Sequence, residues 1–160
     1  MATEVSVMPA ATSSSIHVRC EPEQVYEFVS TPDNWVGTHP VTAAVTAAGA
    51  GVCRQSAGEG TRWTELIHDP DGAEPFAVEW VVVVAEPGRR WVIATDRLRV
   101  PGLHCRITYT FTAAGGGCDF RRDMTSALPD EATARLYGDA LRDPASHDAC
   151  LANVKTALEG

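Results

Sequence analysis

The sequence lacks an excess of basic residues, and this shortage excludes one large class of partners. Its 160 residues include 13 Lys and Arg against 21 Asp and Glu, which gives a formal net charge of -8. Proteins that bind nucleic acid gather Lys and Arg against the phosphate backbone. We therefore expect no nucleic-acid partner.

Long apolar runs are also missing. The longest, 81–85 (VVVVA), is far shorter than the roughly 20 residues that a membrane-spanning helix needs. The segment 1–11 contains Glu4 and no Lys or Arg, unlike the charged start of a secretory signal peptide. We expect a cytoplasmic protein that crosses no membrane, with residues 1–12 as a disordered tail and residues 13–160 as a single domain.

Neither paired cysteines nor a phosphate-binding loop is present. The five cysteines are scattered, without a CxxC or HxxxH spacing. Zinc ligands usually come in close pairs, and a phosphate loop leads from a strand into a helix. The Gly-rich segment 115–117 instead joins two predicted strands. We expect buried free thiols, no metal and no cofactor.

Alternating apolar residues and turn residues predict one strand, two short helices, six strands and a final helix. The strands are expected at 14–20, 41–48, 61–68, 76–85, 90–97, 103–113 and 118–128, and the short helices near 21–29 and 31–35. Hairpin or turn residues stand at 69–72 (DPDG), 86–88 (EPG), 100–102 (VPG) and 115–117 (GGG). This order predicts an α+β fold, with a curved seven-stranded antiparallel sheet under the last helix and an apolar cavity between them.

The last helix, expected at 132–158, contains Pro144, which should kink or interrupt it. Its predicted apolar stripe consists of Leu136, Ala140, His147, Leu151, Val154 and Leu158.

Several of these features resemble a known superfamily. They are Trp35 in the second short helix, the hairpin at 86–88, the segment 109–117 (YTFTAAGGG) and the terminal helix. Together they are similar to START-like, or Bet v 1-like (SRPBCC), proteins, and residues 74–159 resemble bacterial polyketide aromatase/cyclases in length and spacing. The resemblance implies a helix-grip fold and a hydrophobic small-molecule substrate that an acyl carrier protein could deliver. It is compatible with a monomer or a homodimer.

The chain departs from the aromatase/cyclases on one strand. These proteins carry a pocket arginine and tryptophans on the strand that matches 76–85. By this resemblance, Val83 stands at the arginine position and Ala77 and Glu79 stand at the tryptophan positions, while Trp80 would point to the opposite face. The usual proton donor for aldol-type closure would then be missing, which leaves room for heterocyclisation or a pericyclic closure that depends mostly on shape.

Three polar residues on predicted apolar faces are the catalytic candidates, because buried polar groups need a partner or a role. His147 could be a general acid or base, or could bond a carbonyl freed by the Pro144 kink. Glu79 could be a base with a raised pKa, or a surface residue if its face is solvated. Arg122 could polarise a ligand carbonyl or bind a carboxylate or enolate, or could pair with an acid across the sheet.

Residues on the same faces are predicted to line the cavity. Tyr109 could donate a hydrogen bond to a ligand oxygen or be part of the core, and Trp35 is predicted as a structural plug beside a surface His39. Either Trp63 or Glu65 could line the pocket, because both share one strand face. The predicted substrate-binding residues are Tyr109, Trp63, Glu65, Trp35, Phe111, Phe120, Met124, Leu151 and Val83.

Three functions are compatible with these features. The first is a cofactor-independent cyclase that closes a ring in a polyketide-like intermediate. The second is a carrier or sensor for a lipid, isoprenoid or aromatic metabolite, and the third is a protein-binding role through the apolar strand 81–84. Convergence of the inward polar residues would favour catalysis, whereas their dispersal would favour binding alone.

Overall fold

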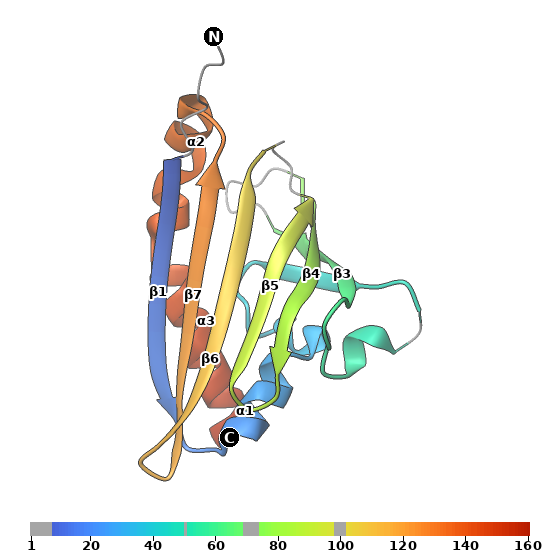
Figure 1. Cartoon of the computed structure of the whole chain (residues 1–160), viewed down its shortest axis with the longest axis vertical. Helices are drawn as coiled ribbons and strands as arrows, with labels where there is room; N and C mark the ends of the chain where they lie inside the picture. Colours follow the sequence, from blue (N-terminus) through green and yellow to red (C-terminus); the bar gives the residue numbers. More distant parts are fainter. Residues whose placement is uncertain (1–7, 50, 69–73, 98–101) are drawn as a thin grey trace.

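A computed structural model describes residues 8–49, 51–68, 74–97 and 102–160 of the chain. Seven strands form one antiparallel sheet in the order β1-β7-β6-β5-β4-β3-β2 (Figure 1). They are β1 (Met8–Val18), β2 (Thr42–Thr46), β3 (Arg62–Ile67), β4 (Phe76–Glu86), β5 (Arg90–Arg97), β6 (His104–Ala114) and β7 (Gly117–Leu128). The predicted seven-stranded sheet is confirmed, and β2 lies at one of its edges.

The first strand is longer than the sequence suggested. It begins at Met8 rather than near residue 14, and its residues 8–12 pair with residues 124–128 of β7, although they were expected in the tail. Ala10 and Thr12 bury one face of this extension. Such small residues give too weak a hydrophobic alternation to reveal a strand. The turn predicted at 69–72 lies outside the described residues, as do residues 100 and 101 of the turn predicted at 100–102.

Two short helical segments connect β1 to β2, as predicted. They are α1 (Pro22–Val29) and the 3-10 helix η1 (Pro32–Trp35). Pro22 suits the first helical position, because the N–H that proline lacks would have no partner within the helix. Glu23 suits the first turn, because the N-terminal end of the helix dipole is positive. A further 3-10 turn, η2 (Val52–Arg54), follows β2.

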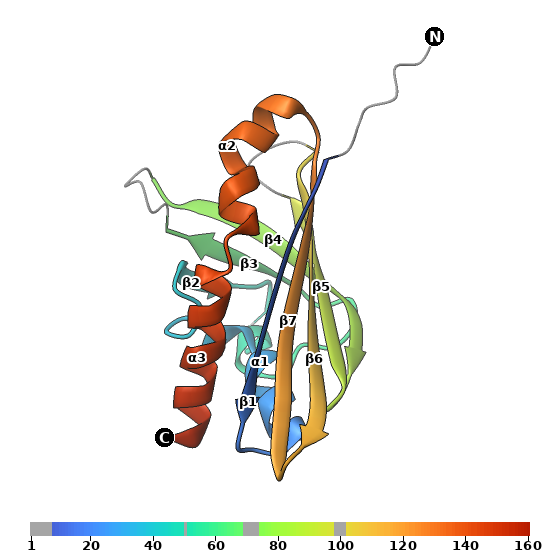
Figure 2. The same cartoon turned by 90° about the vertical axis from the view of Figure 1, so that its left-hand side faces the viewer.

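The C-terminal helix is interrupted as Pro144 predicted. The helix α2 (Glu131–Arg142) begins after Asp130, whose side chain accepts a hydrogen bond from the backbone N–H of Thr133. The helix α3 (Ala145–Glu159) begins directly after Pro144. Both run along the same side of the sheet (Figure 2). The break means that one apolar stripe does not continue through both helices, and Leu136, predicted as part of it, is 76% exposed.

An aromatic cluster fills the space between the sheet and the short helices. Trp35 of η1 meets Trp63, Trp80 and Trp91 edge-to-face, with ring centroids 5.7 to 6.3 Å apart. The indole N–H groups of Trp35 and Trp91 donate to backbone carbonyls. Such large rings contribute much of a core's buried apolar area and pack in fixed geometries. They form a rigid wall beside the polar residues described below.

The cysteines and the helix lengths match what the sequence indicated. All five cysteines are free, and four of them are buried. In the described ranges no helix combines the length and hydrophobicity required to span a membrane.

Candidate functional site

A pocket of about 490 Å³, called the interior pocket below, lies between the inner face of the sheet and the helices α2 and α3. It opens to solvent where the exposed residues Pro40, Ala140, Asp143 and Ser146 line it. Its apolar lining comes mainly from the strands β3, β4, β6 and β7 and from α2; these residues include Ile67, Phe76, Trp80, Ile107, Met124, Tyr137, Ala140 and Leu141. The polar side chains at its wall include Arg122, His147, His39 and Glu65. A mostly apolar pocket with a few polar groups is the usual form of a small-molecule site.

The sheet register brings Arg122 and Tyr109 together. Arg122 on β7 and Tyr109 on β6 are directly opposite each other, so their side chains leave the same face. The Arg122 Nε–H donates to the Tyr109 hydroxyl at 3.2 Å, and both side chains are buried. Tyr109 does not itself line the pocket: it lies behind Arg122 and supports its guanidinium.

His147 lies in the first turn of α3, and its ring contacts the same guanidinium. Nη1 of Arg122 is hydrogen-bonded to Nδ1 of His147. Because arginine has no acceptor, Nδ1 must accept and the ring proton must reside on Nε2. Burial and the charge of Arg122 lower the pKa of His147 to about 4. The imidazole is therefore neutral near pH 7, and its Nε2–H has no hydrogen-bond partner among the described residues.

His39 is a correction to the sequence prediction, which placed it on the surface. It is 6% exposed and lines the pocket, with its ring stacked on Trp35 at a centroid distance of 4.2 Å. The backbone N–H groups of Thr38 and His39 both donate to the Trp35 carbonyl, which turns the chain back over the indole. The helix η1 ends at Trp35, so no helical spacing in the sequence indicated this stacking.

A one-way hydrogen-bond chain connects His39 to the guanidinium. The Thr38 hydroxyl donates to the Asn34 carbonyl at 2.6 Å, so His39 Nδ1, 3.2 Å from that hydroxyl, is the donor. His39 Nε2, 3.3 Å from the Tyr109 hydroxyl, must then accept the phenolic proton. Burial and the positive charge of Arg122 lower the pKa of His39 well below its usual range.

Glu65 on β3 provides a carboxylate on another wall of the pocket. One oxygen accepts a hydrogen bond from the Trp80 indole N–H at 3.0 Å, and the other accepts from the Thr42 hydroxyl. The side chain is 3% exposed, and burial raises its pKa. A carboxylate with a raised pKa is suited to accept a proton from carbon.

Glu79 and Val83 lie on the other face of β4, so the prediction that they face the cavity is wrong. The inner face of this strand carries Val78, Trp80 and Val82, all buried, whereas Val83 is 38% exposed. Side chains point alternately to the two faces of a sheet, so an alignment shifted by one residue assigns every side chain of the strand to the wrong face. Trp80 consequently occupies a pocket position.

The other predicted residues divide between wall and core. Arg122, His147, Glu65, Trp35 and Met124 line the pocket. The remaining ones are buried in the apolar core and do not line it: Trp63, Phe111, Phe120 and Leu151. The sequence reasoning missed Cys150, whose pKa burial raises to about 11, and the side chains of α2 such as Tyr137. Both residues lie on the helices beside predicted stripe residues that line the pocket, Ala140 and His147.

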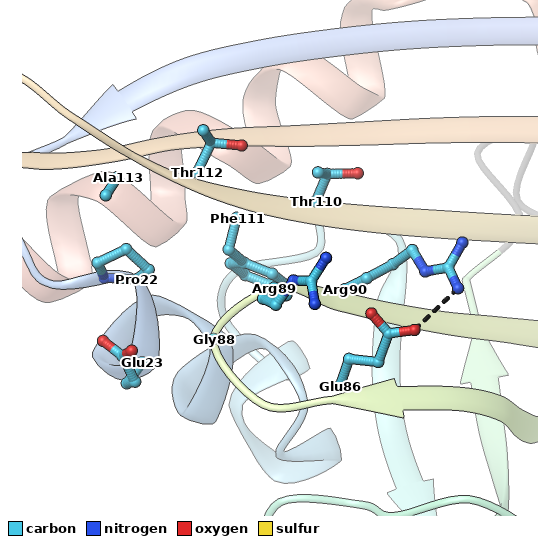
Figure 3. Close-up of a pocket in the computed structure, with 10 residues that line it drawn as sticks. All are labelled: Pro22, Glu23, Glu86, Gly88, Arg89, Arg90, Thr110, Phe111, Thr112 and Ala113. Atoms are coloured by element: carbon cyan, nitrogen blue, oxygen red, sulfur yellow. Dashed lines mark hydrogen bonds and ion pairs between the residues drawn. The ribbon is translucent and has the colours of Figure 1, made fainter.

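A second depression, of about 740 Å³, lies where the β4–β5 turn meets α1 and β6 (Figure 3). Its rim mixes acids and bases: Arg90 pairs with Glu86 at 2.9 Å, and Glu23 and Arg89 are nearby. This depression is open to solvent, and the charges of opposite sign on its rim offset each other. The convergent polar groups belong to the interior pocket, which we take as the candidate site.

Comparisons with known proteins agree with this architecture. A family model described as "Polyketide cyclase / dehydrase and lipid transport" matches residues 9–159. Penitrem biosynthesis cluster 1 protein I of Penicillium ochrochloron is 32% identical over 138 residues, which cover 84% of this chain and 87% of that protein.

Solved structures share the fold at low sequence identity. The di-domain ARO/CYC BexL from the BE-7585A biosynthetic pathway has a TM-score of 0.70 and 19% identity, over 95% of this chain and 50% of that one. The chain thus spans about half the length of BexL, and likewise of the di-domain ARO/CYC StfQ. A point mutant of norcoclaurine synthase from Thalictrum flavum has a TM-score of 0.73 and 12% identity over 98% of both chains.

The structural likenesses support the helix-grip fold, and the family model covers nearly all of the described strands and helices. The chain belongs to the polyketide cyclase/dehydrase and lipid transport family of the Bet v 1-like (SRPBCC) superfamily.

Proposed function

We propose that this protein is a cofactor-independent cyclase that closes a ring in a polyketide-like intermediate held in the interior pocket. The observation that carries the proposal is convergence. Arg122 contacts both His147 and Tyr109, and Tyr109 contacts His39, beside an apolar pocket that also exposes Glu65. A pocket that only carries an apolar ligand has little need of so many linked buried polar groups, which are costly to bury.

Glu65 acts as the base in this proposal. Its carboxylate takes a proton from a carbon between two substrate carbonyls, which forms an enolate. The enolate carbon attacks a second carbonyl carbon of the same chain, a carbon–carbon bond forms, and the carbonyl oxygen becomes an alkoxide. The proton held by Glu65 returns to that alkoxide, so the closure is an isomerisation; loss of water gives a dehydrated product.

Arg122 and His147 stabilise the developing negative charge. The guanidinium is fixed by Tyr109, and His147 presents its Nε2–H. Preorganised donors in a site shielded from water commonly account for a factor of about 10² to 10³ in rate each. The pocket walls contribute by holding a flexible chain folded, which removes part of the entropic barrier.

A carrier of hydrophobic ligands is the second candidate, and the state of the two histidines favours it. The lone pairs of His147 Nδ1 and His39 Nε2 both accept hydrogen bonds within the protein, which leaves Glu65 as the base. The family description also includes lipid transport.

Native mass spectrometry with a synthetic linear poly-β-ketone thioester separates the two functions. A cyclase converts the bound thioester to an isomer with a new retention time or to a product lighter by one water. Retention of the unchanged linear thioester for hours, with no product above the protein-free control, would contradict the cyclase and support the carrier. Glu65→Gln should bind the thioester and convert it at least about 100-fold more slowly.

A further inference from the structure

Arg122 is a buried cation whose two hydrogen-bonded partners are both neutral. The residue is 8% exposed, and it donates to the Tyr109 hydroxyl and to His147 Nδ1. No carboxylate in the described part of the chain forms an ion pair with it. Buried charges are normally paired, since an uncompensated one costs several kcal/mol.

The groups around Arg122 are poorly placed to supply the missing negative charge. Burial raises the pKa of the Tyr109 phenol, and it raises that of the Cys150 thiol to about 11, so both are neutral near pH 7. Glu65 influences Arg122 through space but accepts its hydrogen bonds from Thr42 and Trp80. Asp143 also lines the pocket, but its carboxylate accepts a hydrogen bond from the backbone N–H of Ala145 and has no bond to Arg122. A counter-ion in direct contact with the guanidinium is therefore left to a ligand.

The hydrogen-bond donors of Arg122 and His147 also favour an anionic ligand. A guanidinium has five N–H donors, and Arg122 uses two of them on protein acceptors. The Nε2–H of His147 is also without a partner among the described residues, and both side chains line the pocket. A group of unsatisfied donors with a positive charge matches a planar pair of anionic oxygens, as in a carboxylate.

Away from Arg122 and His147 much of the pocket wall is apolar, although His39, Glu65, Asp143 and Ser146 also line it. This apolar part of the wall consists of Ile67 and Phe76 on the sheet and Tyr137 and Leu141 on α2. From these observations we infer that the pocket binds an organic carboxylate, with its acidic end at Arg122 and His147 and an apolar body against α2 and β3. This inference goes beyond the proposed function: it gives a ligand class for the same pocket, and the carboxylate would occupy the donors that the cyclase directs at the alkoxide.

The test compares naphthoic acid with its methyl ester at pH 7.5, by isothermal titration calorimetry and by quenching of the tryptophan fluorescence. Trp35 and Trp80 line the pocket and should report a ligand there. The acid should bind at least about tenfold more tightly than the ester, a difference of about 1.4 kcal/mol, because hydrogen bonds to charged groups are stronger than those between neutral groups.

Three variants attribute this preference to the guanidinium. Arg122→Gln should reduce the ratio of acid to ester affinity to near one, whereas Arg122→Lys should retain part of it because the charge remains. Tyr109→Phe keeps the cation and should keep the preference. Circular dichroism and a thermal melt of each variant verify folding, and the Arg122→Lys and Tyr109→Phe proteins provide the answer if Arg122→Gln does not fold.

Turnover of a neutral linear poly-β-ketone thioester, measured on the same native protein, keeps the two proposals apart. Equal affinity for acid and ester, or a preference that survives Arg122→Gln, would overturn the carboxylate inference even if the thioester is cyclised. A preference for the acid without any turnover would support the inference and count against the cyclase.

Discussion

Arg122 donates a hydrogen bond from Nη1 to Nδ1 of His147, so the imidazole at the pocket wall is neutral with its proton on Nε2. The sequence offered His147 as a general acid or base. In this geometry Nε2–H of His147 remains available as a donor, while Nδ1 already accepts a hydrogen bond from Arg122. The pair works as one donor unit, with Arg122 bearing the charge.

Acidification should destabilise the protein between about pH 6.5 and pH 4. The unfolded chain protonates His147 near the ordinary histidine pKa of 6.5, whereas the folded state does so only at about 4. The unfolded state therefore binds more protons in this window, and the free energy of unfolding falls with pH by up to about 1.4 kcal/mol per unit for each such histidine. His39, with its pKa lowered well below the usual range, adds in the same direction.

Urea unfolding at pH 7, 6 and 5 measures this effect. Glu65 opposes the trend, because burial raises its pKa and the folded state gains its proton first. Comparison with His147→Gln isolates the histidine, since the variant should show a shallower pH dependence. An identical slope in both proteins would refute the assignment of His147 as a neutral buried ring.

Replacing Arg122 by Met should leave the unliganded protein as stable as the native protein, or more stable by up to about 3 kcal/mol. The substitution removes the buried charge itself, and neither Tyr109 nor His147 is left charged. Arg106→Met, on the exposed face of β6, is the matched control and should change stability by less than about 0.5 kcal/mol. Chemical unfolding measures both. A loss of more than about 2 kcal/mol for Arg122→Met alone would show that the guanidinium is structural.

Two glycines should respond oppositely to alanine. In Gly138→Ala the new Cβ comes closest to the end of the flexible Arg142 side chain, at 2.7 Å, and is in ordinary contact with Leu128 at 3.8 Å. The higher helix propensity of Ala should therefore stabilise α2 by about 0.5–1 kcal/mol. In Gly117→Ala it overlaps the Val18 carbonyl oxygen and lies 3.1 Å from the Arg19 Cα, so a loss of about 1–3 kcal/mol is expected. Thermal melts compare each variant with the native protein, and two melting temperatures equal to the native value would contradict both expectations.

The fold was predictable because its signals are local. Turn residues and apolar alternation placed β3 to β7 within a residue or two, and Pro144 marked the break between α2 and α3. The extension of β1 was missed because it consists of small and polar residues. Its stability comes from pairing with β7, a long-range contact that a single sequence does not reveal.

The candidate site was predictable only in part. Arg122 and Tyr109 each stood on an alternating strand, so their inward faces followed from the pattern. On β4 the apolar run around Val82 has no alternation, and the face of Glu79 was therefore undetermined until the strand's neighbours fixed it. His39 was missed because its burial depends on the turn after η1 and on the Trp35 ring.

The two carboxylates of adjacent strands provide the last test, because they undergo the same chemical change on opposite faces. Glu65→Gln keeps an oxygen for the Trp80 indole N–H but removes the base, so it should slow cyclisation of the linear poly-β-ketone thioester at least about 100-fold. Glu79 lies outside the pocket on β4, and Glu79→Gln should leave the rate within about twofold of the native value. Single-turnover assays by mass spectrometry give both rates, and a binding titration with the same thioester establishes that Glu65→Gln is still occupied. If Glu79→Gln abolished the reaction and Glu65→Gln did not, the assignment of the pocket face of the sheet would have to be reversed.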